Sequence, residues 1–286
     1  MTDPHDEPRL DRRRFVRTTV AGLAAGLSAS GGDTRDARAE SGPAARPAAF
    51  TRLHNKPLRI GILIFPDMDQ IDFTGPFEVL ARTPDAQVHV IGTQPGPFRD
   101  HLGMVLTPDM TLADAPVLDV LQVPGGPGQE ALMGNEGVLG AIRDHMAADK
   151  PLFSVCTGAL ICGAAGILRR RRATTHWAAF DLLPYFGAIA VRERVVIDGN
   201  LVSAAGVTAG IDGALRLVSL LRDDEVAQRI QLDVQYAPEP PFRAGLPETA
   251  PRSVLAAVTA KYQPLTEARI ATARRIAALL GNASRH

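Results

Sequence analysis

The amino-acid sequence predicts an α/β fold: a doubly wound, mostly parallel sheet flanked by helices, with a small β-hairpin. Short runs of apolar and β-branched residues alternate along the chain with segments of helical spacing, which is the pattern of repeated strand-helix-strand units. The apolar runs lack the alternation of a half-exposed strand, so their strands are expected to be buried on both faces. An Asp-Gly-Asn turn at residues 198–200 joins two further strand-like runs.

Each element of this fold has its own sequence signal. Apolar character predicts four central strands, at residues 59–65, 87–92, 117–124 and 151–155. Helical spacing predicts the intervening helices, at residues 75–81, 136–147 and 159–168. The hairpin is expected at residues 194–203, and two later helices at residues 210–221 and 252–280. Because proline has no backbone N–H, the last helix is expected to be interrupted near Pro264.

The composition is that of an ordinary soluble globular protein. The 286 residues are 45% hydrophobic, which is enough to form the core of one large or two small domains. Lys and Arg number 31, as do Asp and Glu, so the formal net charge is +0. A nucleic-acid partner is therefore not expected, because such a surface needs a basic excess. The four arginines at residues 169–172 follow a predicted helix and are interpreted as a solvated turn.

The beginning of the chain differs in character from the rest. Residues 1–39 contain an arginine cluster, a mild apolar stretch and an Ala-Arg-Ala sequence, an arrangement typical of a twin-arginine-type export signal. The apolar stretch is too short to span a membrane, so no membrane association is expected after signal removal. Residues 40–56 are expected to form a linker, and residues 57–286 an α/β domain with a C-terminal helical extension. Export predicts a periplasmic or otherwise exported protein; an unused signal would leave it cytoplasmic.

Cys156 carries the clearest chemical signal. It ends the predicted strand 151–155 and is followed at once by Thr157, Gly158 and a predicted helix, which is the pattern of a nucleophile elbow. Such a turn raises the thiol above the sheet and directs the N–H groups of a helix N-terminus at the sulfur, which favours the thiolate. A buried structural cysteine is the alternative interpretation. A disulfide with Cys162 is not expected, because both residues belong to one short segment and do not face each other.

Three loops are expected to meet at the carboxyl ends of the strands, where doubly wound proteins bind ligands. The first carries Asp72 between two apolar residues; in a partly dry pocket beside a thiolate its pKa would be raised, making it a proton donor. The alternative role for Asp72 is a helix N-cap, and Asp69 is expected to be an ordinary solvated residue. The second loop contains Gly125 and Gly126, whose N–H groups can form an anion-stabilising nest. The third is the Cys156 turn.

Three further side chains are candidates for this site. His176 could act as the base for Cys156, or simply pack beside the single tryptophan. Thr157 offers a hydroxyl and an N–H for an oxyanion site, with helix capping as the alternative role. Thr208 lies in a glycine-dense segment, residues 205–213, that is not a dinucleotide-binding motif and is expected to close one wall of the pocket. Cys and His residues do not cluster at ligand spacing, so no metal is expected.

Several segments together resemble the ThiJ/PfpI superfamily, whose members have a flavodoxin-like, class I glutamine amidotransferase-like fold. They are the Cys156 turn, the Pro-Gly-Gly sequence at residues 124–126 and the Ala-Thr-Thr-His-Trp sequence at residues 173–177. The resemblance extends over residues 57–240. Within the superfamily, the chain is similar to the isonitrile hydratase branch in four segments, at residues 71–76, 154–158, 172–177 and 235–242.

The resemblance implies a hydro-lyase that converts an isonitrile (isocyanide) to an N-substituted formamide, without a metal or organic cofactor. Cys156 would be the nucleophile, Asp72 the acid/base partner and Thr157 an assisting neighbour. The thiolate would attack the terminal carbon while a proton reaches that carbon, giving a thioimidate that water then cleaves. N–H groups near Gly126 and Thr157 would stabilise the charged intermediate. The resemblance also implies a homodimer.

Two other functions are compatible with the sequence. The same thiolate could serve a glyoxalase-like enzyme or an amidase. Proteases and deglycase-like members of the superfamily often carry histidine directly after the cysteine, and many members use glutamate as the acid. This chain has Thr157 and Asp72 at these two positions, which favours the hydratase. A ligand-sensing domain of a transcription regulator is disfavoured, because residues 252–280 leave too little room for a helix-turn-helix pair.

Overall fold

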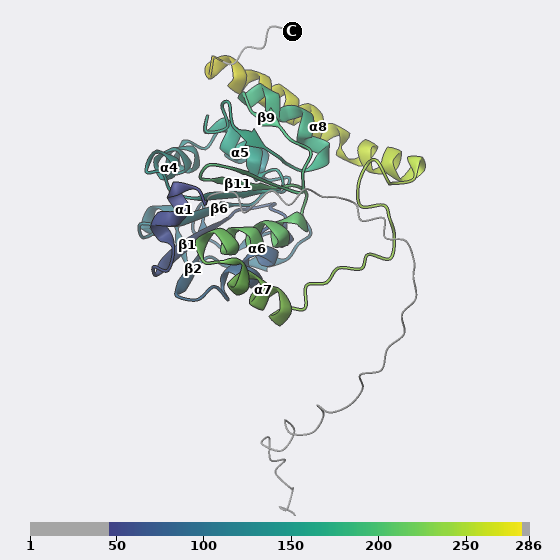
Figure 1. Ribbon diagram of the computed structural model, residues 1–286. Helices are drawn as coiled ribbons and strands as arrows, with labels where there is room; N and C mark the ends of the chain where they lie inside the picture. Colours follow the sequence, from purple (N-terminus) through teal and green to yellow (C-terminus); the bar gives the residue numbers. More distant parts are fainter. Residues whose placement is uncertain (1–45, 282–286) are drawn as a thin grey trace, which may run out of the picture. The chain divides into compact units, whose positions relative to one another are not determined.

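A seven-stranded sheet forms the centre of the structure, with the strand order β10-β11-β7-β6-β1-β2-β5 (Figure 1). The computed structural model describes residues 46–281, so the expected export signal and residues 40–45 of the expected linker lie outside the described residues. All neighbouring strands pair in parallel except the β10-β11 hairpin, which is antiparallel. The predicted mostly parallel sheet and hairpin are confirmed. The strands are β1 (Leu58–Ile64), β2 (Ala86–Gly92), β5 (Met110–Thr111), β6 (Val120–Val123), β7 (Leu152–Val155), β10 (Val195–Asp198) and β11 (Leu201–Ala204).

Helices cover both faces of the sheet. On one face α1 (Ala48–Leu53), α2 (Gln70–Leu80) and α7 (Asp224–Asp233) pack around α6 (Ala209–Leu221). The other face carries α3 (Gln129–Leu132), α4 (Glu136–Ala147), α5 (Gly158–Ala164), the 3-10 segment η2 (Trp177–Phe186) and the long α8 (Arg252–Leu279). Short pieces complete the fold: η1 (Leu112–Asp114) and the strand pairs β3 (Phe98–Arg99) with β4 (Val105–Leu106) and β8 (Arg172–Ala173) with β9 (Ile189–Ala190).

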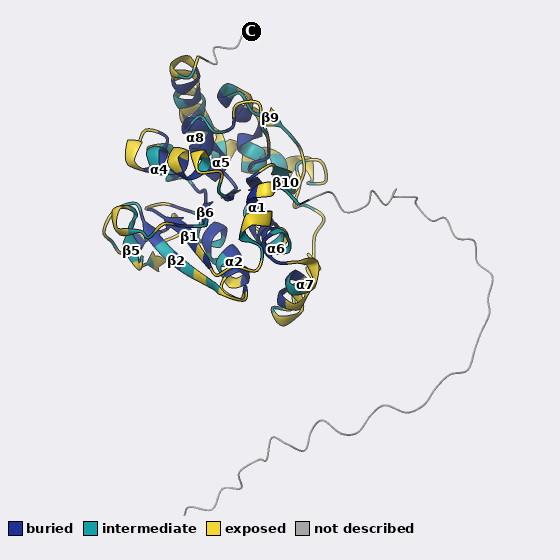
Figure 2. Ribbon diagram, turned by 60° about the vertical axis from the view of Figure 1, so that its left-hand side comes forward, coloured by how far each residue is buried: buried dark blue, intermediate teal, exposed yellow. Residues whose placement is uncertain are grey.

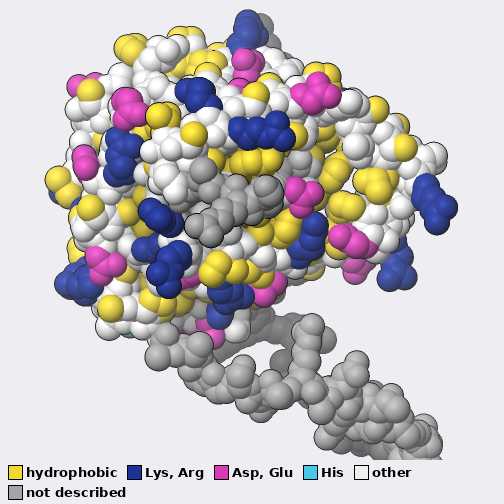
Figure 3. Space-filling view, turned by 90° about the horizontal axis from the view of Figure 1, so that it is seen from above, with side chains coloured by type: hydrophobic (Ala, Val, Ile, Leu, Met, Phe, Trp, Pro, Cys, Tyr) yellow, Lys and Arg dark blue, Asp and Glu magenta, His cyan; other side chains and the backbone are white. Residues whose placement is uncertain are grey.

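The central strands are buried on both faces, as their continuous apolar character predicts. Every residue of β6, β7 and β11 is buried, and β1 is buried except at Arg59. Figure 2 shows this buried centre surrounded by helices whose outer faces are exposed. Lys and Arg side chains are interspersed with Asp and Glu on the face seen in Figure 3. Within residues 46–281, none of the helices combines the length and apolar character that crossing a bilayer requires.

Several elements differ from their predicted bounds for local reasons. The strand predicted at 117–124 is shorter and begins at Val120: the N–H of Asp119 still donates to the carbonyl of Arg59, but the N–H of Arg59 donates to the Asp119 carboxylate in place of a backbone carbonyl. The helix predicted at 159–168 ends at Ala164, ahead of Gly166 with its positive φ of 81°. α2 begins five residues before the predicted helix 75–81, because the side chain of Asp69 caps it by accepting from the N–H of Ile71.

Two predictions at the ends of the domain are wrong. The segment expected as a linker contains α1, and the side chain of Phe50 is fully buried in the core, so the domain begins before Pro57. α8 runs through Pro264 without interruption. The lost hydrogen bond and the steric cost of this proline are offset by packing, since α8 lies against η2 and α3.

Candidate active site

Cys156 stands in a strained turn between β7 and α5, as the elbow pattern predicts. Its φ is +54°, a conformation that is costly for a residue other than glycine. The turn is held from both sides. The N–H of Cys156 donates to the carbonyl oxygens of Ala204 (3.0 Å) and Ala205 (2.9 Å), and its own carbonyl accepts from the hydroxyl of Thr175 (2.7 Å). Gly158 completes it, because a Cβ there would lie 2.1 Å from the carbonyl oxygen of Val123.

Asp72 is fully buried in the first turn of α2, and its carboxyl group lies next to the thiol of Cys156. Its Oδ2 accepts from the N–H of Gly125 at 2.9 Å, and the side chain of Gln122 donates to its backbone carbonyl at 2.7 Å. Burial, with the charge of nearby Asp69, raises the pKa of Asp72 to about 8, although the Gly125 N–H and the neighbouring thiol act in the opposite direction. Asp72 is therefore mostly a neutral acid at pH 7. The N-cap of α2 is Asp69, so the capping role considered for Asp72 belongs to its neighbour.

The thiol of Cys156 is also kept protonated. Burial and the charge of Asp72 raise its pKa well above the ordinary value, whereas the N–H groups of Val207 and Thr157 lower it by pointing at the sulfur. The expected N–H donors are therefore present, but burial outweighs them, and a free thiolate is disfavoured until the proton can be transferred. Val207 presents its N–H from an unusual backbone conformation, with φ at +25°.

The three strand-end loops are joined to one another through Thr157, Gly125 and Gly126. The hydroxyl of Thr157 accepts from the N–H of Gly126 at 3.0 Å, and a Cβ on Gly125 would lie 2.5 Å from the N–H of Thr157. Gly126 has φ at +121°, and its added Cβ would meet the backbone of Asp69 at 2.2 Å. The N–H groups of Gly125 and Gly126 are thus occupied by Asp72 and Thr157. The two N–H groups therefore position the side chains of Asp72 and Thr157, and they do not form the open anion nest that the sequence predicted.

His176 and Thr208 are placed differently from each other. His176 lines the cavity beside Cys156. Its Nδ1 accepts from the N–H of Ala178 at 3.3 Å, and among the described residues it has no hydrogen bond to the thiol. Burial, with the positive charge of Arg269, lowers the pKa of His176 to about 4, so the ring is neutral at pH 7. Thr208 is exposed, accepts from Arg194 at 3.3 Å and lies outside the cavity; Val207 takes the position expected for it.

Cys156 lines a cavity of about 200 Å³, whereas Asp72 lies buried behind the thiol and is not part of the lining. Strand-end loops supply Asp69, Gly126, Pro127, Cys156, Thr157 and Val207, and the lining also includes His101 and His176. The remaining lining residues come from α8: Lys261, Tyr262, Leu265 and Arg269. Arg269 is only 3% exposed, and its Nη2 donates to the carbonyl of Gly126 at 3.2 Å.

The contribution of α8 was not foreseen from the sequence. Tyr262, Leu265 and Arg269 recur at helical spacing and so share one face, which was a detectable signal. An arginine within an otherwise packed stripe is unusual, because a buried charge must find a partner. Helical periodicity predicts which side chains share a face, but not what that face covers.

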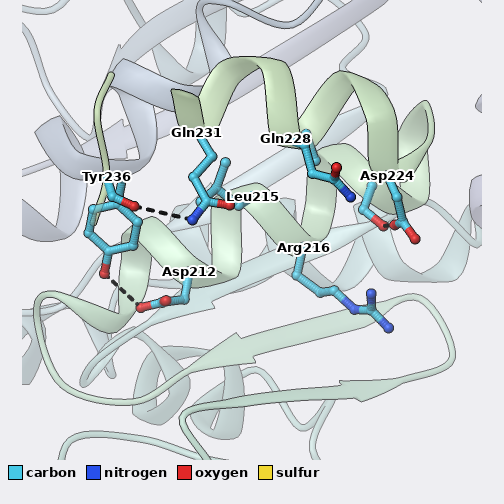
Figure 4. A pocket seen from close by; sticks show the side chains of 9 residues that line it. Asp212, Leu215, Arg216, Asp224, Gln228, Gln231 and Tyr236 are labelled. Atoms are coloured by element: carbon cyan, nitrogen blue, oxygen red, sulfur yellow. Dashed lines mark hydrogen bonds between the residues drawn. The ribbon is translucent and has the colours of Figure 1, made fainter. Parts of the chain in front are cut away.

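A second hollow, of about 360 Å³, lies between α6 and α7 and contains none of these groups (Figure 4). Polar groups of its wall bond to one another: the hydroxyl of Tyr236 donates to Asp212 at 3.1 Å, and Gln231 donates to the carbonyl of Tyr236 at 3.1 Å. Cys156 and Cys162 are both free thiols. The described part of the chain holds no cluster of three or more His, Cys, Asp or Glu residues suited to a metal ion.

Comparison with known proteins agrees with this geometry. The DJ-1/PfpI family model matches residues 58–220. An isonitrile hydratase from Pseudomonas putida is 48% identical over 223 residues, which cover 78% of this chain and 98% of that enzyme. A ThiJ/PfpI family protein from Pseudomonas syringae superposes with a TM-score of 0.74 at 37% identity, covering 76% of this chain and 91% of that structure. A deglycase from Pyrococcus horikoshii is 26% identical over 149 residues, 51% of this chain and 89% of the relative. The chain therefore belongs to the DJ-1/PfpI family.

Proposed function

We propose that this protein is an isonitrile hydratase, which adds water to R–NC and releases the N-substituted formamide R–NH–CHO. The observation that carries the proposal is the buried pair of Asp72 and Cys156, a neutral carboxylic acid beside a thiol that lines a small cavity. An isonitrile carbon needs both a proton and a nucleophile, and this pair supplies both. The 48% identity to the Pseudomonas putida enzyme, over nearly its whole length, supports the same reaction.

In the first step, the acid form of Asp72 gives its proton to the terminal carbon of the isonitrile. The sulfur of Cys156 forms a bond to the same carbon, and the thiol proton returns to the Asp72 carboxylate. The product is a thioimidate, R–N=CH–S–Cys156, and Asp72 is again neutral. A carboxyl with a pKa near 8 suits this role, because it holds its proton at neutral pH and is still acidic enough to give it up.

In the second step, water adds to the thioimidate carbon. Asp72 gives its acid proton to the nitrogen and takes a proton from the water, which leaves R–NH–CH(OH)–S–Cys156 and a neutral Asp72. As the C–S bond breaks, the proton of the new hydroxyl passes to the sulfur, so R–NH–CHO is released and the thiol is restored. N–H groups of Val207 and Thr157 point at the sulfur, so they stabilise the negative charge that develops there when it leaves.

Formamide production tests this proposal directly. The full chain is incubated with an alkyl isonitrile, and the N-alkyl formamide is quantified beside Cys156→Ser and Cys156→Ala variants. We expect formamide from the parent and a loss of at least about a thousand-fold in both variants. Consumption of methylglyoxal without any formamide would instead favour the glyoxalase-like alternative, which uses the same cysteine.

We also propose that the protein is exported by the twin-arginine pathway, on the basis of the arginine cluster and the Ala-Arg-Ala sequence within residues 1–39. A reporter fused to these residues should leave the cytoplasm only when the twin-arginine machinery is intact. Cytoplasmic retention in both backgrounds would refute export.

We propose in addition that the protein forms a homodimer, as the family resemblance implies. Light scattering at several concentrations should give a mass near twice 30.4 kDa for the full chain, or the corresponding value after signal removal. A monomer mass at all concentrations would contradict the proposal.

A further inference from the structure

Arg269 is a buried cation whose bonding capacity is largely unused. Its guanidinium has five N–H donors, but the described residues offer it one hydrogen bond, from Nη2 to the carbonyl of Gly126, and its buried Nε has no partner. No ion pair joins it to a carboxylate within residues 46–281. Burying an unpaired charge is costly, so its position in the cavity wall calls for a ligand that supplies the missing acceptors.

The nearby acids are already engaged. Asp69 is the single carboxylate among the described side chains that line the cavity with Arg269, and its Oδ1 caps α2 through the N–H of Ile71. Glu130 acts on Arg269 from outside the lining, and its Oε2 accepts from the side chain of Gln129.

A second cation extends the positive wall toward solvent. Lys261 is exposed and also lines the cavity, two helical turns before Arg269 on α8, with Leu265 between them. The wall thus offers an apolar stretch flanked by two positive groups. The thiol of Cys156 lines the same cavity, close enough for a charge on the sulfur to act on Arg269.

We propose that the isonitrile hydrated by this protein carries a carboxylate, which Arg269 binds while the isonitrile carbon faces Cys156. A carboxylate matches the planar, forked guanidinium and would satisfy donors that are otherwise unpaired. Leu265 packs against a short apolar spacer, and Lys261 attracts the anion at the entrance. This inference rests on the proposed function, since it names the substrate class of the same site.

The alternative role of Arg269 is structural, as a clamp between α8 and the Gly126 loop. The two roles predict different kinetics. Loss of a clamp disturbs the turnover of every isonitrile, whereas loss of an anion-binding group weakens only the binding of anionic ones.

The test compares 3-isocyanopropanoate with its neutral methyl ester, using the full chain, Arg269→Met and Arg269→Lys. Arg275→Met, a loss of charge at an exposed position of the same helix, is the matched control. For the parent we expect a higher kcat/KM with the carboxylate. In Arg269→Met, kcat/KM for the carboxylate should fall about 10- to 100-fold, mainly because KM rises. For the ester, kcat/KM should change by less than about threefold. Arg269→Lys should keep part of the preference. A parent that prefers the ester, or a variant that loses both substrates equally, would overturn the inference.

A binding measurement separates this inference from the reaction itself. N-formyl-β-alanine, the formamide expected from 3-isocyanopropanoate, is titrated calorimetrically into the parent, Arg269→Met and Arg275→Met. Weaker binding to Arg269→Met alone supports the carboxylate site even if no isonitrile is hydrated, in which case the proposed function fails by itself. Equal binding to all three proteins would refute the carboxylate site, whatever the activity.

Discussion

At the scale of single residues, the site depends on two acids that hold their protons. The pKa of Asp72 is raised to about 8 and that of Cys156 well above its ordinary value, each first by burial. A thiol that does not ionise is a poor nucleophile on its own. In the proposed mechanism its proton is taken up by a carboxylate that has just protonated the substrate, so we expect that neither residue can act without the other.

The pH profile should therefore follow Asp72. We expect kcat/KM for an isonitrile to fall as pH rises through about 8, because the acid form of the free enzyme is lost. Asp72→Asn keeps a similar shape without a transferable proton, so activity should drop about a hundred- to ten-thousand-fold and this fall should disappear. Initial rates at low substrate concentration, from pH 5.5 to 9.5, check it. A parent rate that increases through pH 8 would mean that the carboxylate form is the active one.

The sequence predicted which side chains meet at the strand ends better than it predicted their hydrogen bonds. Cys156, Asp72 and Thr157 could be brought together because parallel strands place their carboxyl ends at one edge. Which N–H group meets which acceptor could not be predicted, since it depends on positions set by several elements at once. The sequence thus assigned the Gly126 N–H to a ligand, whereas it donates to Thr157, and it assigned a pocket role to Thr208, whose hydroxyl accepts from Arg194.

At the scale of elements, packing around the turn between β7 and α5 sets the position of Cys156. A methyl group on Gly158 would meet the Val123 carbonyl at 2.1 Å, whereas one on Gly134 would meet nothing within 4 Å. We expect Gly158→Ala to displace the Cys156 turn and lower kcat by at least about a hundred-fold, and Gly134→Ala to leave kcat nearly unchanged. Circular dichroism shows whether each variant is folded. Full activity in Gly158→Ala would mean that the turn tolerates a shift of this size.

α1 should matter for stability although its sequence looked like a linker. Phe50 is fully buried, so Phe50→Ala should lower the free energy of unfolding by about 3–5 kcal/mol through lost burial and a cavity. Leu232→Ala in α7 is the control, because that side chain is 81% exposed and its loss should cost less than about 0.5 kcal/mol. Urea unfolding of the full chain measures both. Equal effects would show that α1 is not part of the cooperative core.

Elements with strong periodicity in the sequence were predicted well, whereas elements whose formation or bounds depend on tertiary packing were not. The predicted helix 136–147 coincides with α4, whose N-cap Asn135 and apolar spacing are both local signals. α1 was missed because its six residues are too few to show a period, and it is stabilised by the burial of Phe50. The break expected at Pro264 followed from local propensity, which the packing of α8 on η2 overrides.

At the scale of the whole molecule, the buried acid links catalysis to stability. The pKa of Asp72 is about 8 in the folded protein against an ordinary 3.8, so the folded state binds a proton that the unfolded chain has released. The contribution of Asp72 to the free energy of unfolding is fully present below about pH 4 and declines as pH rises toward 8. His176 acts in the opposite direction between about pH 4 and 6.5, because its folded pKa is lowered to about 4. Both groups change the stability between about pH 4 and 6.5, in opposite directions. Between about pH 6.5 and 8 the change due to Asp72 dominates.

Asp72→Asn separates these contributions, because it removes one titration and leaves the other. We expect the variant to gain stability relative to the parent by about 1.4 kcal/mol for each pH unit between 4 and 8, with no further gain above 8. Urea unfolding of both proteins at pH 5, 6, 7, 8 and 9 measures this difference. A difference that stays constant with pH would mean that Asp72 is ionised in the folded protein, and it would remove the proton donor on which the first step depends. The variant that is most stable above neutral pH should thus also be among the least active, because the same buried proton serves both properties.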